Sequence, residues 1–585
     1  MLFSIGHHRV TFLVCSALLS LSQGEQTVEK VVLETSQGKL LGVRSLSRAG
    51  KPYLSFKGIP YGEIVTRFEP AILASSWEGI KDGSKPGNMC PQFSRATQTV
   101  VGEEDCLFLN VFVPERAIKN NYVLEEDRVL LPVVVFIHGG AYQFGTGSDY
   151  GGGYFVDEDT ILVTMNYRLG AIGFLSTGDD VIQGNAGLKD QSLALRWIQE
   201  HILSFGGDKG RVTLMGTSAG GASVSFQVLS PYSSGLFHGA QTISGSVLNS
   251  WSLHPNPVKS TEELAEILDC PTQPTSALAE CLRLTDFKKI MSVRLAKWNV
   301  DPLCQFSPVV ETLRPGESIS DVFLAEQPLK LLEEGRFNKV PVITGVTKDE
   351  GLLFHAAGIM KNPELQRNMN EDWNTVAPIT LLYDHHAPPE QLVDISRRIR
   401  GYYFGGGTIG RETFKNLTNL YSDRYFNHGV KKAALLMAKW TPVYPFILGF
   451  QGEWSILNLY YGDVYKEPLG VSHGDDMRLI FNSARFPEIP LGSEMELFSK
   501  QVVRLYASFA KTGNLMDAMT SWKTTWLPIG IEEVKRSRMK WFYMDVNPKM
   551  ILEPFTERVD FWDKIEAQFA NLRMENENIV ERNEL

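Results

Sequence analysis

The sequence predicts an α/β fold in which a central, mostly parallel sheet is covered by helices on both faces. Three apolar runs have the length and composition of buried parallel strands, at residues 133–137, 161–165 and 340–344. A helix-like stretch separates the second run from a further strand-like segment at residues 211–215. Strands that alternate with helices in this way favour a doubly wound sheet.

The remaining elements are placed around this sheet. The helix expected at Gln191–Ser204 carries apolar side chains at helical spacing, namely Leu193, Ala194, Trp197, Ile198 and Ile202. The chain before residue 120 is poorer in long apolar runs, so we expect an antiparallel edge there. Residues 255–340 and 355–465 are predicted to be helical insertions that roof the sheet.

Length alone would allow several domains, but the composition favours one. The chain has 585 residues, of which 43% are hydrophobic, and it shows no Gly/Ser/Pro-rich linker, low-complexity tract or internal repeat. We expect one domain over residues 25–570 and a charged, flexible tail over residues 571–585. The 57 basic residues are scattered among 67 acidic ones, which argues against a nucleic-acid partner.

The first 24 residues have the pattern of a secretory signal peptide. Arg9 precedes an apolar run from Val10 to Leu21, and small residues at positions 22 and 24 suit cleavage before Glu25. The run is too short for a membrane span, and we expect no transmembrane segment in the mature chain. A signal anchor is the alternative interpretation.

Five cysteines follow the predicted cleavage site, so one thiol is expected to be unpaired. The pairs Cys90–Cys106 and Cys270–Cys281 would close short local loops, as suits an oxidising compartment. Cys304 is then the odd residue, expected as a buried free thiol. Because no CxxC or His-x-x-x-His spacing occurs, we expect no metal, and we expect no organic cofactor.

The motif Gly216-Thr217-Ser218-Ala219-Gly220 lies between the strand at 211–215 and a run of small residues that begins a helix. Its outer glycines allow strand and helix to approach closely around a sharp turn that exposes the serine hydroxyl. Chance alone gives about 0.3 matches to Gly-x-Ser-x-Gly in such a chain, so the strand–turn–helix context is what indicates a nucleophile elbow at Ser218.

A nucleophilic serine needs a base, a group that orients the base, and donors for an oxyanion. The turn His138-Gly139-Gly140-Ala141-Tyr142 follows the strand at 133–137 and can supply backbone N–H groups, to which Ala219 adds another. For the acid, Asp349 and Glu350 both follow the strand at 340–344, and their positions alone do not separate them.

His473 is the predicted base because it lies in a loop and follows the serine and the acid in chain order. His355 is set aside because it is too close in sequence to the acid to come from another loop. His385 and His386 lie in a polar loop flanked by proline and are expected to be solvated.

With these motifs, the chain resembles the type B carboxylesterases, which include liver carboxylesterases, insect esterases and cholinesterases. Gly184–Gln191 continued by Phe205–Asp208, and also Glu104–Leu107, resemble further signatures of that family. The resemblance spans about residues 30–565. It implies an α/β-hydrolase fold and hydrolysis of small apolar esters through an acyl-enzyme.

The resemblance also assigns roles. It implies Glu350 as the acid and His473 as the base, with oxyanion donors at Gly140, Ala141 and Ala219. Ala141 stands where the family usually has a third glycine, so the N–H is kept while the shape of the hole can differ. Two buried ion pairs are implied as well, Arg67–Glu104 and Arg168–Asp190.

Two other functions are weighed against this one. A catalytically inactive adhesion or binding module of the neuroligin type would lack part of the site, whereas every element is present here. A hormone- or odorant-clearing esterase is a narrower alternative, and Asp475-Asp476 resembles juvenile hormone esterases. Cholinesterases carry a glutamate just before the serine and a tryptophan in the first disulfide loop, which faces the choline cation. This chain has Thr217 before the serine and no tryptophan in the 90–106 loop, so acetylcholine is disfavoured as a substrate.

Two further motifs concern location. Arg582–Leu585 resembles the Lys-Asp-Glu-Leu class of endoplasmic-reticulum retention signals, so we expect lumenal retention or secretion. Asn416-Leu417-Thr418 is a sequon that could carry one glycan. The sequence leaves the oligomeric state open.

Overall fold

The computed structural model describes residues 29–119, 129–295, 303–353, 355–462, 469–522 and 524–583. The expected signal peptide and the last two residues of the retention-like sequence lie outside the described residues. Among the helices described, none combines the length and the apolar character that crossing a membrane requires.

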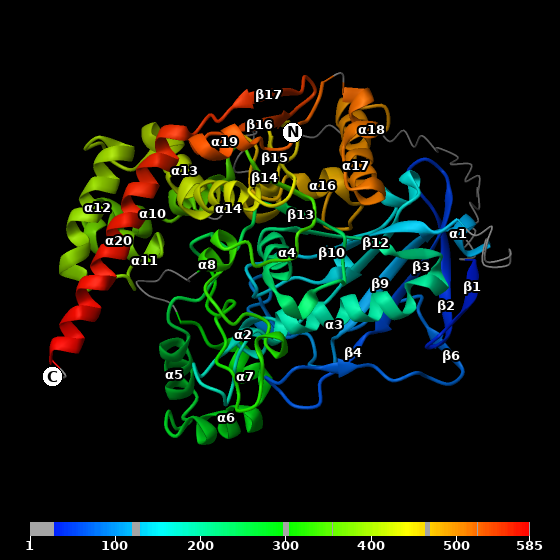
Figure 1. Ribbon diagram of the computed structural model, residues 1–585, viewed down its shortest axis with the longest axis horizontal. Helices are drawn as coiled ribbons and strands as arrows, with labels where there is room; N and C mark the ends of the chain where they lie inside the picture. Colours follow the sequence, from blue (N-terminus) through cyan, green and yellow to red (C-terminus); the bar gives the residue numbers. More distant parts are fainter. Residues whose placement is uncertain are drawn as a thin grey trace, which may run out of the picture.

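One large sheet runs across the molecule (Figure 1), with strands in the order β1-β2-β3-β9-β11-β10-β12-β13-β14-β15-β16-β17 and β6 beside β2. Neighbours are parallel from β11 to β16, and antiparallel among β1, β2, β3, β9 and β11 and between β16 and β17. The antiparallel edge predicted before residue 120 is therefore confirmed. The strands are β1 (Lys30–Thr35), β2 (Gly38–Leu46), β3 (Pro52–Pro60), β6 (Ile80–Asp82), β9 (Phe108–Pro114), β10 (Leu131–Ile137), β11 (Ile161–Met165), β12 (Gly207–Thr217), β13 (Gly239–Ile243), β14 (Val342–Thr347), β15 (Val443–Leu448), β16 (Lys540–Met544) and β17 (Lys549–Leu552). Two short pairs lie apart, β4 (Gly62–Glu63) with β5 (Ile72–Leu73) and β7 (Gln92–Ser94) with β8 (Thr99–Val101).

The four predicted parallel strands correspond to β10, β11, β12 and β14. β14 begins two residues later than expected, because the Val340 N–H closes a turn onto the Asn338 carbonyl. The prediction of an insertion over residues 355–465 is wrong at β15, a fully buried strand between β14 and β16. Pro445 lies in that strand and lacks an N–H for the ladder, so the segment did not have the composition of a central strand.

Helices cover both faces of the sheet. Successive residues of β10 point to opposite layers: Val133 and Val135 join one core, and Val134 and Phe136 join the other. The first core is closed by α3 (Ala186–His201), α4 (Ala219–Leu229) and α14 (His428–Met437), and the second by α17 (Glu494–Thr512) (Figure 1). The predicted doubly wound architecture is therefore present.

The other helices lie mainly in the insertions and at the C-terminal end. They are α1 (Glu115–Lys119), α2 (Gly170–Phe174), α5 (Pro257–Ile267), α6 (Thr275–Leu284), α7 (Phe287–Ser292), α8 (Pro328–Glu333), α9 (Ala356–Lys361), α10 (Pro363–Glu371), α11 (Trp373–Thr380), α12 (Pro389–Phe404), α13 (Phe414–Ser422), α15 (Ile456–Tyr461), α16 (Asp476–Ile480), α18 (Met516–Met519), α19 (Ile531–Arg536) and α20 (Thr556–Asn583). α20 continues to Asn583, so it includes residues 571–583, the stretch assigned above to a charged tail. Glutamate, arginine, leucine and methionine, which favour helices, account for much of that stretch.

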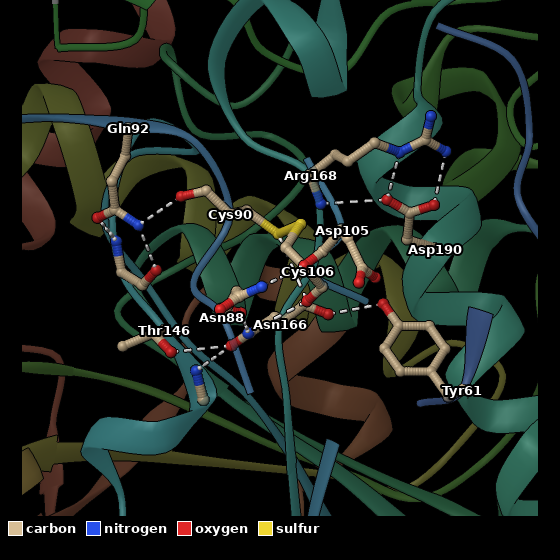
Figure 2. Close-up of a disulfide and its surroundings, with 12 residues drawn as sticks. Tyr61, Asn88, Cys90, Gln92, Asp105, Cys106, Thr146, Asn166, Arg168 and Asp190 are labelled. Carbon is tan, nitrogen blue, oxygen red and sulfur yellow. Dashed lines mark hydrogen bonds and ion pairs between the residues drawn. A yellow bond between two sulfur atoms is a disulfide. The ribbon is translucent and has the colours of Figure 1, made fainter. Parts of the chain in front are cut away.

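Both expected disulfides are present, Cys90–Cys106 and Cys270–Cys281, and Cys304 is free and partly exposed. Figure 2 shows the first disulfide beside the buried pair Arg168–Asp190, whose guanidinium and carboxylate meet at 2.8 and 2.6 Å. The predicted pair Arg67–Glu104 is also present, at 2.7 and 2.6 Å, but it is only partly buried rather than buried as expected. Two parallel charge-assisted bonds make each pair geometrically specific.

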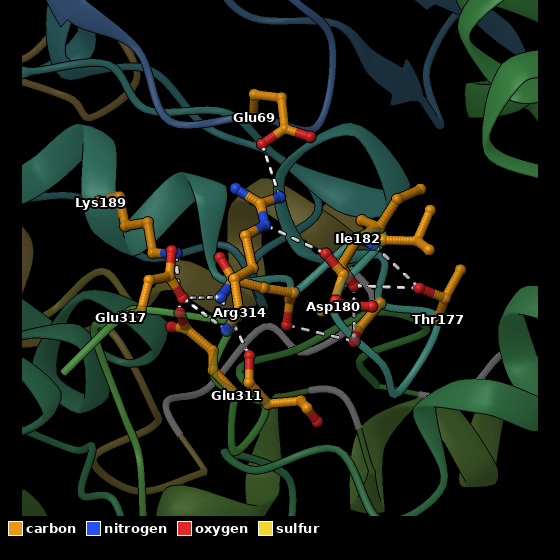
Figure 3. Close-up of polar contacts among 12 residues, drawn as sticks. Glu69, Thr177, Asp180, Ile182, Lys189, Glu311, Arg314 and Glu317 are labelled. Carbon is orange, nitrogen blue, oxygen red and sulfur yellow. Dashed lines mark hydrogen bonds and ion pairs between the residues drawn. The ribbon is translucent and has the colours of Figure 1, made fainter. Parts of the chain in front are cut away.

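Polar contacts tie the segment before α8 onto the sheet domain (Figure 3). The buried Lys189 ammonium lies 2.7 Å from the Glu311 carboxylate. The Arg314 guanidinium lies 2.9 Å from the Glu69 carboxylate and donates to the Asp180 carbonyl at 3.0 Å. These contacts hold residues 311–314 in place, and Leu303, Gln305 and Phe306, a few residues earlier in the chain, line the cavity described below.

Candidate active site

The turn between β12 and α4 places Ser218 in a strained conformation. Its φ is 62° and its ψ is −127°, a region that residues with side chains rarely adopt and that gathers at functional sites. The neighbouring residues must lack side chains for this turn to form. A Cβ on Gly220 would lie 2.0 Å from the Ile137 carbonyl oxygen, and one on Gly216 would lie 2.3 Å from the Gly220 carbonyl oxygen.

Glu350, just after β14, and His473, in the loop before α16, come together in the structure. The Glu350 carboxylate lies 2.6 Å from Nδ1 of His473 through Oε2. Its Oε1 accepts hydrogen bonds from the Thr347 N–H at 2.7 Å and from the Ser244 hydroxyl at 2.5 Å. Three donors therefore fix a carboxylate that is only 1% exposed. With Nδ1 engaged, the imidazole keeps Nε2 for a second partner.

Asp349, the other candidate acid, holds the backbone of the histidine loop instead. It accepts a hydrogen bond from the Val471 N–H at 3.0 Å and pairs with Lys415. The Asp349 N–H donates in return to the Val471 carbonyl at 2.9 Å. The structure thus brings Glu350 to the imidazole of His473, whereas Asp349 anchors the chain two residues earlier.

The glycine turn after β10 lies directly against the serine. A Cβ on Gly139 would lie 3.0 Å from Cβ of Ser218. Gly140 has a φ of 115°, and a Cβ there would lie 1.8 Å from the Phe144 carbonyl oxygen. A side chain at Gly140 therefore cannot be accommodated without moving the turn.

Three backbone N–H groups near the serine are uncommitted. Across the residues that the structure describes, those of Gly140, Ala141 and Ala219 donate to no protein acceptor. Ala141 has a φ of 55°, a conformation that glycine adopts more easily. Uncommitted N–H groups beside a serine hydroxyl have the chemistry of an oxyanion hole, because they can donate to a negative oxygen without prior rearrangement.

These residues face one cavity of about 420 Å³, a size suited to a small molecule. Ser218, Glu350, His473 and the turn 139–141 all line it. Much of the remaining wall is apolar or aromatic and includes Trp251, Leu353, Ile359, Leu365, Leu382 and Phe426. Residues that the sequence predicts separately are therefore brought together at the C-terminal ends of the parallel strands.

A π-helix places two aromatic residues in that wall. It spans Asp423–Asn427 and joins α13 to α14 without a break. The Tyr425 carbonyl accepts from the Asn249 amide at 2.7 Å and from the Trp251 indole at 2.8 Å. The Phe426 ring centroid lies 4.6 Å from that of His473. A π-helix often marks a functional site, and nothing in the sequence pattern signals this one.

Asp476 is a further buried acid close to the site. Its Oδ2 accepts a hydrogen bond from the Thr217 hydroxyl at 3.1 Å, and its Oδ1 has no protein partner among the described residues. Burial raises the pKa of this carboxyl to about 6, and the neighbouring His473 opposes part of that rise. No motif links Asp476 with Thr217. Ser244 could have been found, because it directly follows β13 at the same edge of the sheet.

The structure also shows the surroundings of three other residues considered in the sequence analysis. His386 was expected to be solvated, but it is only 8% exposed and stacks on Phe569 at 4.2 Å. His355, which sequence distance set aside, lines the cavity. Asn416 is exposed on α13, and its amide donates to the Tyr403 carbonyl at 2.5 Å.

Comparison with known proteins gives a consistent result. The model of the carboxylesterase family matches residues 29–562. A carboxylic ester hydrolase from Bombus ignitus is 34% identical over 91% of this chain and 94% of its own. Esterase FE4 from Myzus persicae is 35% identical over 88% of each chain. A crystal structure of juvenile hormone esterase from Manduca sexta, with OTFP covalently attached, superposes with a TM-score of 0.77, covering 92% of this chain and 100% of that one at 25% identity.

The family match covers most of the chain, and the fold is that of the solved esterase. The site that this fold carries holds a serine, a histidine and a buried carboxylate around one cavity. The chain therefore belongs to the carboxylesterase family, and it is a carboxylic ester hydrolase with the α/β-hydrolase fold.

Proposed function

We propose that the protein cleaves its esters through an acyl-enzyme formed on Ser218. In this mechanism, the serine oxygen attacks the ester carbonyl while Nε2 of His473 takes its proton. His473 then returns the proton to the departing alcohol. A water molecule attacks the acyl-enzyme with His473 again as the base, and the acid is released.

Glu350 orients the base in this proposal. Its carboxylate accepts the Nδ1–H of His473, which directs Nε2 toward the serine and stabilises the imidazolium formed during attack. The hydrogen bonds from Thr347 and Ser244 keep the carboxylate aimed at the ring. Glu350 itself exchanges no proton in the reaction.

The oxyanion of the tetrahedral intermediate is stabilised by the N–H groups of Gly140, Ala141 and Ala219. These donors are fixed by the glycine turn and by the start of α4, and they are uncommitted in the described structure. Donors that are already oriented stabilise developing charge with little reorganisation. No metal or organic cofactor takes part in the proposed steps.

The observation that carries the proposal is the shared cavity, which joins the strained Ser218 to the hydrogen-bonded pair Glu350–His473. The direct test is labelling with an organophosphate followed by peptide mass spectrometry. We expect one adduct, on Ser218, and loss of activity in proportion to labelling. An adduct on another serine with the same loss of activity would refute the assignment.

A catalytically inactive binding module of the neuroligin type is the alternative function. It predicts no turnover of any ester and no reaction with the organophosphate, so the same labelling experiment separates the two. The complete set of serine, histidine, carboxylate and oxyanion donors supports the enzyme.

We propose a small apolar ester as the substrate, because most of the cavity wall is apolar. A narrower possibility is clearance of a hormone or an odorant; the solved relative is named a juvenile hormone esterase. Rates on a panel of esters that differ separately in acyl and alcohol size would distinguish a selective enzyme from a general one. A flat ranking across the panel would contradict a hormone- or odorant-specific role.

We also propose that the protein enters the secretory pathway and resides in the endoplasmic-reticulum lumen or outside the cell. Two disulfides suit an oxidising compartment, and Asn416 is exposed where one glycan could attach. Expression of the full chain beside a variant lacking residues 582–585 tests retention. Equal secretion of both would show that the terminal sequence does not retain the protein.

A further inference from the structure

His355 is a polar side chain held firmly in the wall of the cavity. Its ring lies face to face with that of Tyr421, with centroids 4.4 Å apart and planes 18° apart. The Tyr425 ring meets it edge to face, also at 4.4 Å. Two aromatic neighbours therefore fix the plane of the imidazole, so its nitrogens point in defined directions.

The cavity wall around His355 is mainly apolar, with hydroxyl groups contributed by Thr380, Tyr421 and Tyr425. We call this region the α9–α11 compartment; its lining includes Leu353, His355, Ile359, Leu365, Ile379 and Leu382. The helices that form it contact one another and the π-helix region through α13. Among these six side chains, only that of His355 can donate or accept a hydrogen bond.

The ring nitrogens of His355 form no hydrogen bond with the protein in the part of the chain that the structure describes. It precedes α9 but makes no capping hydrogen bond with its side chain, and no described residue bonds its nitrogens. Burial lowers the pKa of His355 to about 3, with the nearby His473 acting in the same direction. The neutral imidazole offers one N–H donor and one nitrogen acceptor.

We propose that His355 determines specificity by hydrogen-bonding an uncharged oxygen of the substrate, so that the preferred substrates are apolar esters carrying a hydroxyl, ether or carbonyl oxygen in the half that enters the α9–α11 compartment. This inference rests on the proposed function. The additional substrate oxygen is not required by the residues that carry out the reaction.

A run of neighbouring rings joins His355 to the reacting base, His473. His355 lies 4.4 Å from Tyr425, Tyr425 lies 6.4 Å from Phe426, and Phe426 lies 4.6 Å from His473, each measured between centroids. No direct contact between the rings of His355 and His473 occurs among the described residues; the run of rings that joins them passes through Tyr425 and Phe426. The recognised oxygen lies several bonds from the ester carbonyl.

Selectivity arises because an apolar chain in this compartment excludes water from the His355 ring. An oxygen on the substrate replaces the lost hydrogen bond, whereas a methylene group leaves the nitrogen unsatisfied. A hydrogen bond of ordinary net strength changes the preference by about 3- to 10-fold.

The test compares esters that differ by one oxygen. p-Nitrophenyl heptanoate and its analogue with an ether oxygen in place of one distal methylene probe the acyl half; hexyl butyrate and its ether analogue probe the alcohol half. We measure kcat and KM for each on the full chain and take the ratio within each pair. His355→Phe keeps a ring and removes both nitrogens, so it should lower the ratio by about 3- to 10-fold in one pair, mainly through KM.

Matched variants separate recognition from packing. His355→Gln keeps a donor and an acceptor and should restore part of the preference. Leu365→Ala enlarges the same compartment without removing a polar atom and should change both members of a pair alike. Organophosphate titration counts active sites, and His355→Leu replaces His355→Phe if the latter does not fold.

An unchanged ratio in both pairs, with His355 replaced and the sites titrated, would overturn this inference. So would an equal change in both members of each pair, which would make His355 a packing residue only. Failure of the wild-type protein to hydrolyse the plain carbon esters would instead count against the proposed function. The two failures are therefore distinguishable.

Discussion

The floor and the wall of the cavity are built in different ways. The floor comprises the turn 138–142, the elbow 216–220, Glu350 and His473, and it is fixed by close backbone contacts and buried hydrogen bonds. The wall is supplied largely by the insertions and consists mainly of packed side chains, with the ring of His355 bonded to no described residue. One part is held by constraints that allow almost no substitution, and the other by contacts that allow many.

Because the two parts are held differently, the reaction and the choice of substrate can vary separately. Function lies in sites carried by a fold, and a change in a loop or insertion need not disturb the strand ends. Substitutions in the floor should slow every ester by a similar factor. Substitutions in the wall should change the ranking of esters. The following experiments test where that boundary lies.

Ser218→Ala should have the largest effect. Without the nucleophile, kcat should fall by about four or more decades on every ester, because only binding and the oxyanion donors are left. Thermal unfolding and circular dichroism should match the wild type, since alanine is similar in size. Substantial turnover of even one ester by the variant would mean that the floor does not act through Ser218.

Glu350→Gln should lower kcat by about 10³- to 10⁴-fold, because a neutral amide cannot stabilise the imidazolium and favours the wrong tautomer. Asp349→Asn is the matched control: it neutralises the adjacent acid, which contacts the Val471 N–H rather than the imidazole. Steady-state kinetics on the same esters should show a much smaller loss for the control. Equal losses would assign the two acids to one shared structural role.

Gly140→Ala should lower kcat by about 10²- to 10³-fold, the cost of misplacing an oxyanion donor. The added Cβ would lie 1.8 Å from the Phe144 carbonyl oxygen, so the turn must move. Gly235→Ala introduces a side chain at a φ of 76° with no atom within 4 Å, and it should leave kcat nearly unchanged. Similar kcat values for the two variants would show that this turn does not contribute to the floor.

Asp476→Asn tests a residue at the edge of the floor. The carboxyl, with a pKa raised to about 6, is ionised above that pH, where its charge stabilises the imidazolium formed during attack. We expect kcat/KM at pH 8 to fall by about tenfold, equivalent to about 1.4 kcal/mol of transition-state stabilisation. The gap should narrow below pH 6, where the wild-type carboxyl is also neutral.

The stability of the same variant should change with the opposite sense. The folded-state pKa of Asp476 lies above its usual value, so the protonated carboxyl contributes to the free energy of unfolding at low pH. That contribution is lost as the pH rises through about 6. Unfolding experiments at pH 8 should therefore find Asp476→Asn no less stable than the wild type. A kinetic gap that is constant from pH 5 to pH 8 would remove Asp476 from this account.

Ala141→Gly should have the smallest effect. The N–H is kept, so kcat/KM should stay within about threefold of the wild type on all esters. Glycine adopts the φ of 55° without strain, so the free energy of unfolding should change by no more than about 1 kcal/mol. A change in ester ranking would place Ala141 in the wall as well as the floor.

The residues that lie together in the floor could be predicted from the sequence because their constraints are local. The elbow at Ser218 needs glycine on both sides, and chain order then indicates His473 as the candidate base. The choice between Asp349 and Glu350 needed the family resemblance, because both follow the same strand. Asp476 was missed because its contact with Thr217 joins residues far apart in the chain.

The wall could not be predicted in the same way. Its residues are positioned by tertiary packing, which leaves little periodic signal. β15 was concealed by Pro445, and the surroundings of His355 depend on Tyr421 and Tyr425, more than sixty residues further along the chain. The charge pattern after residue 570 likewise did not predict that α20 continues to Asn583.

The π-helix at Asp423–Asn427 makes the length of this segment as important as its composition. Deleting one residue there would restore ordinary helical winding and turn the following residues by about 100° relative to the preceding ones. The deletion would put a residue with a side chain where Gly429 now lies. A Cβ at that position would lie 2.5 Å from the Leu248 carbonyl oxygen, so the shifted helix would not fit. An insertion or deletion here would therefore have to be matched by a change in the loop after β13, so this part of the wall can evolve by substitution much more readily than by changes in chain length.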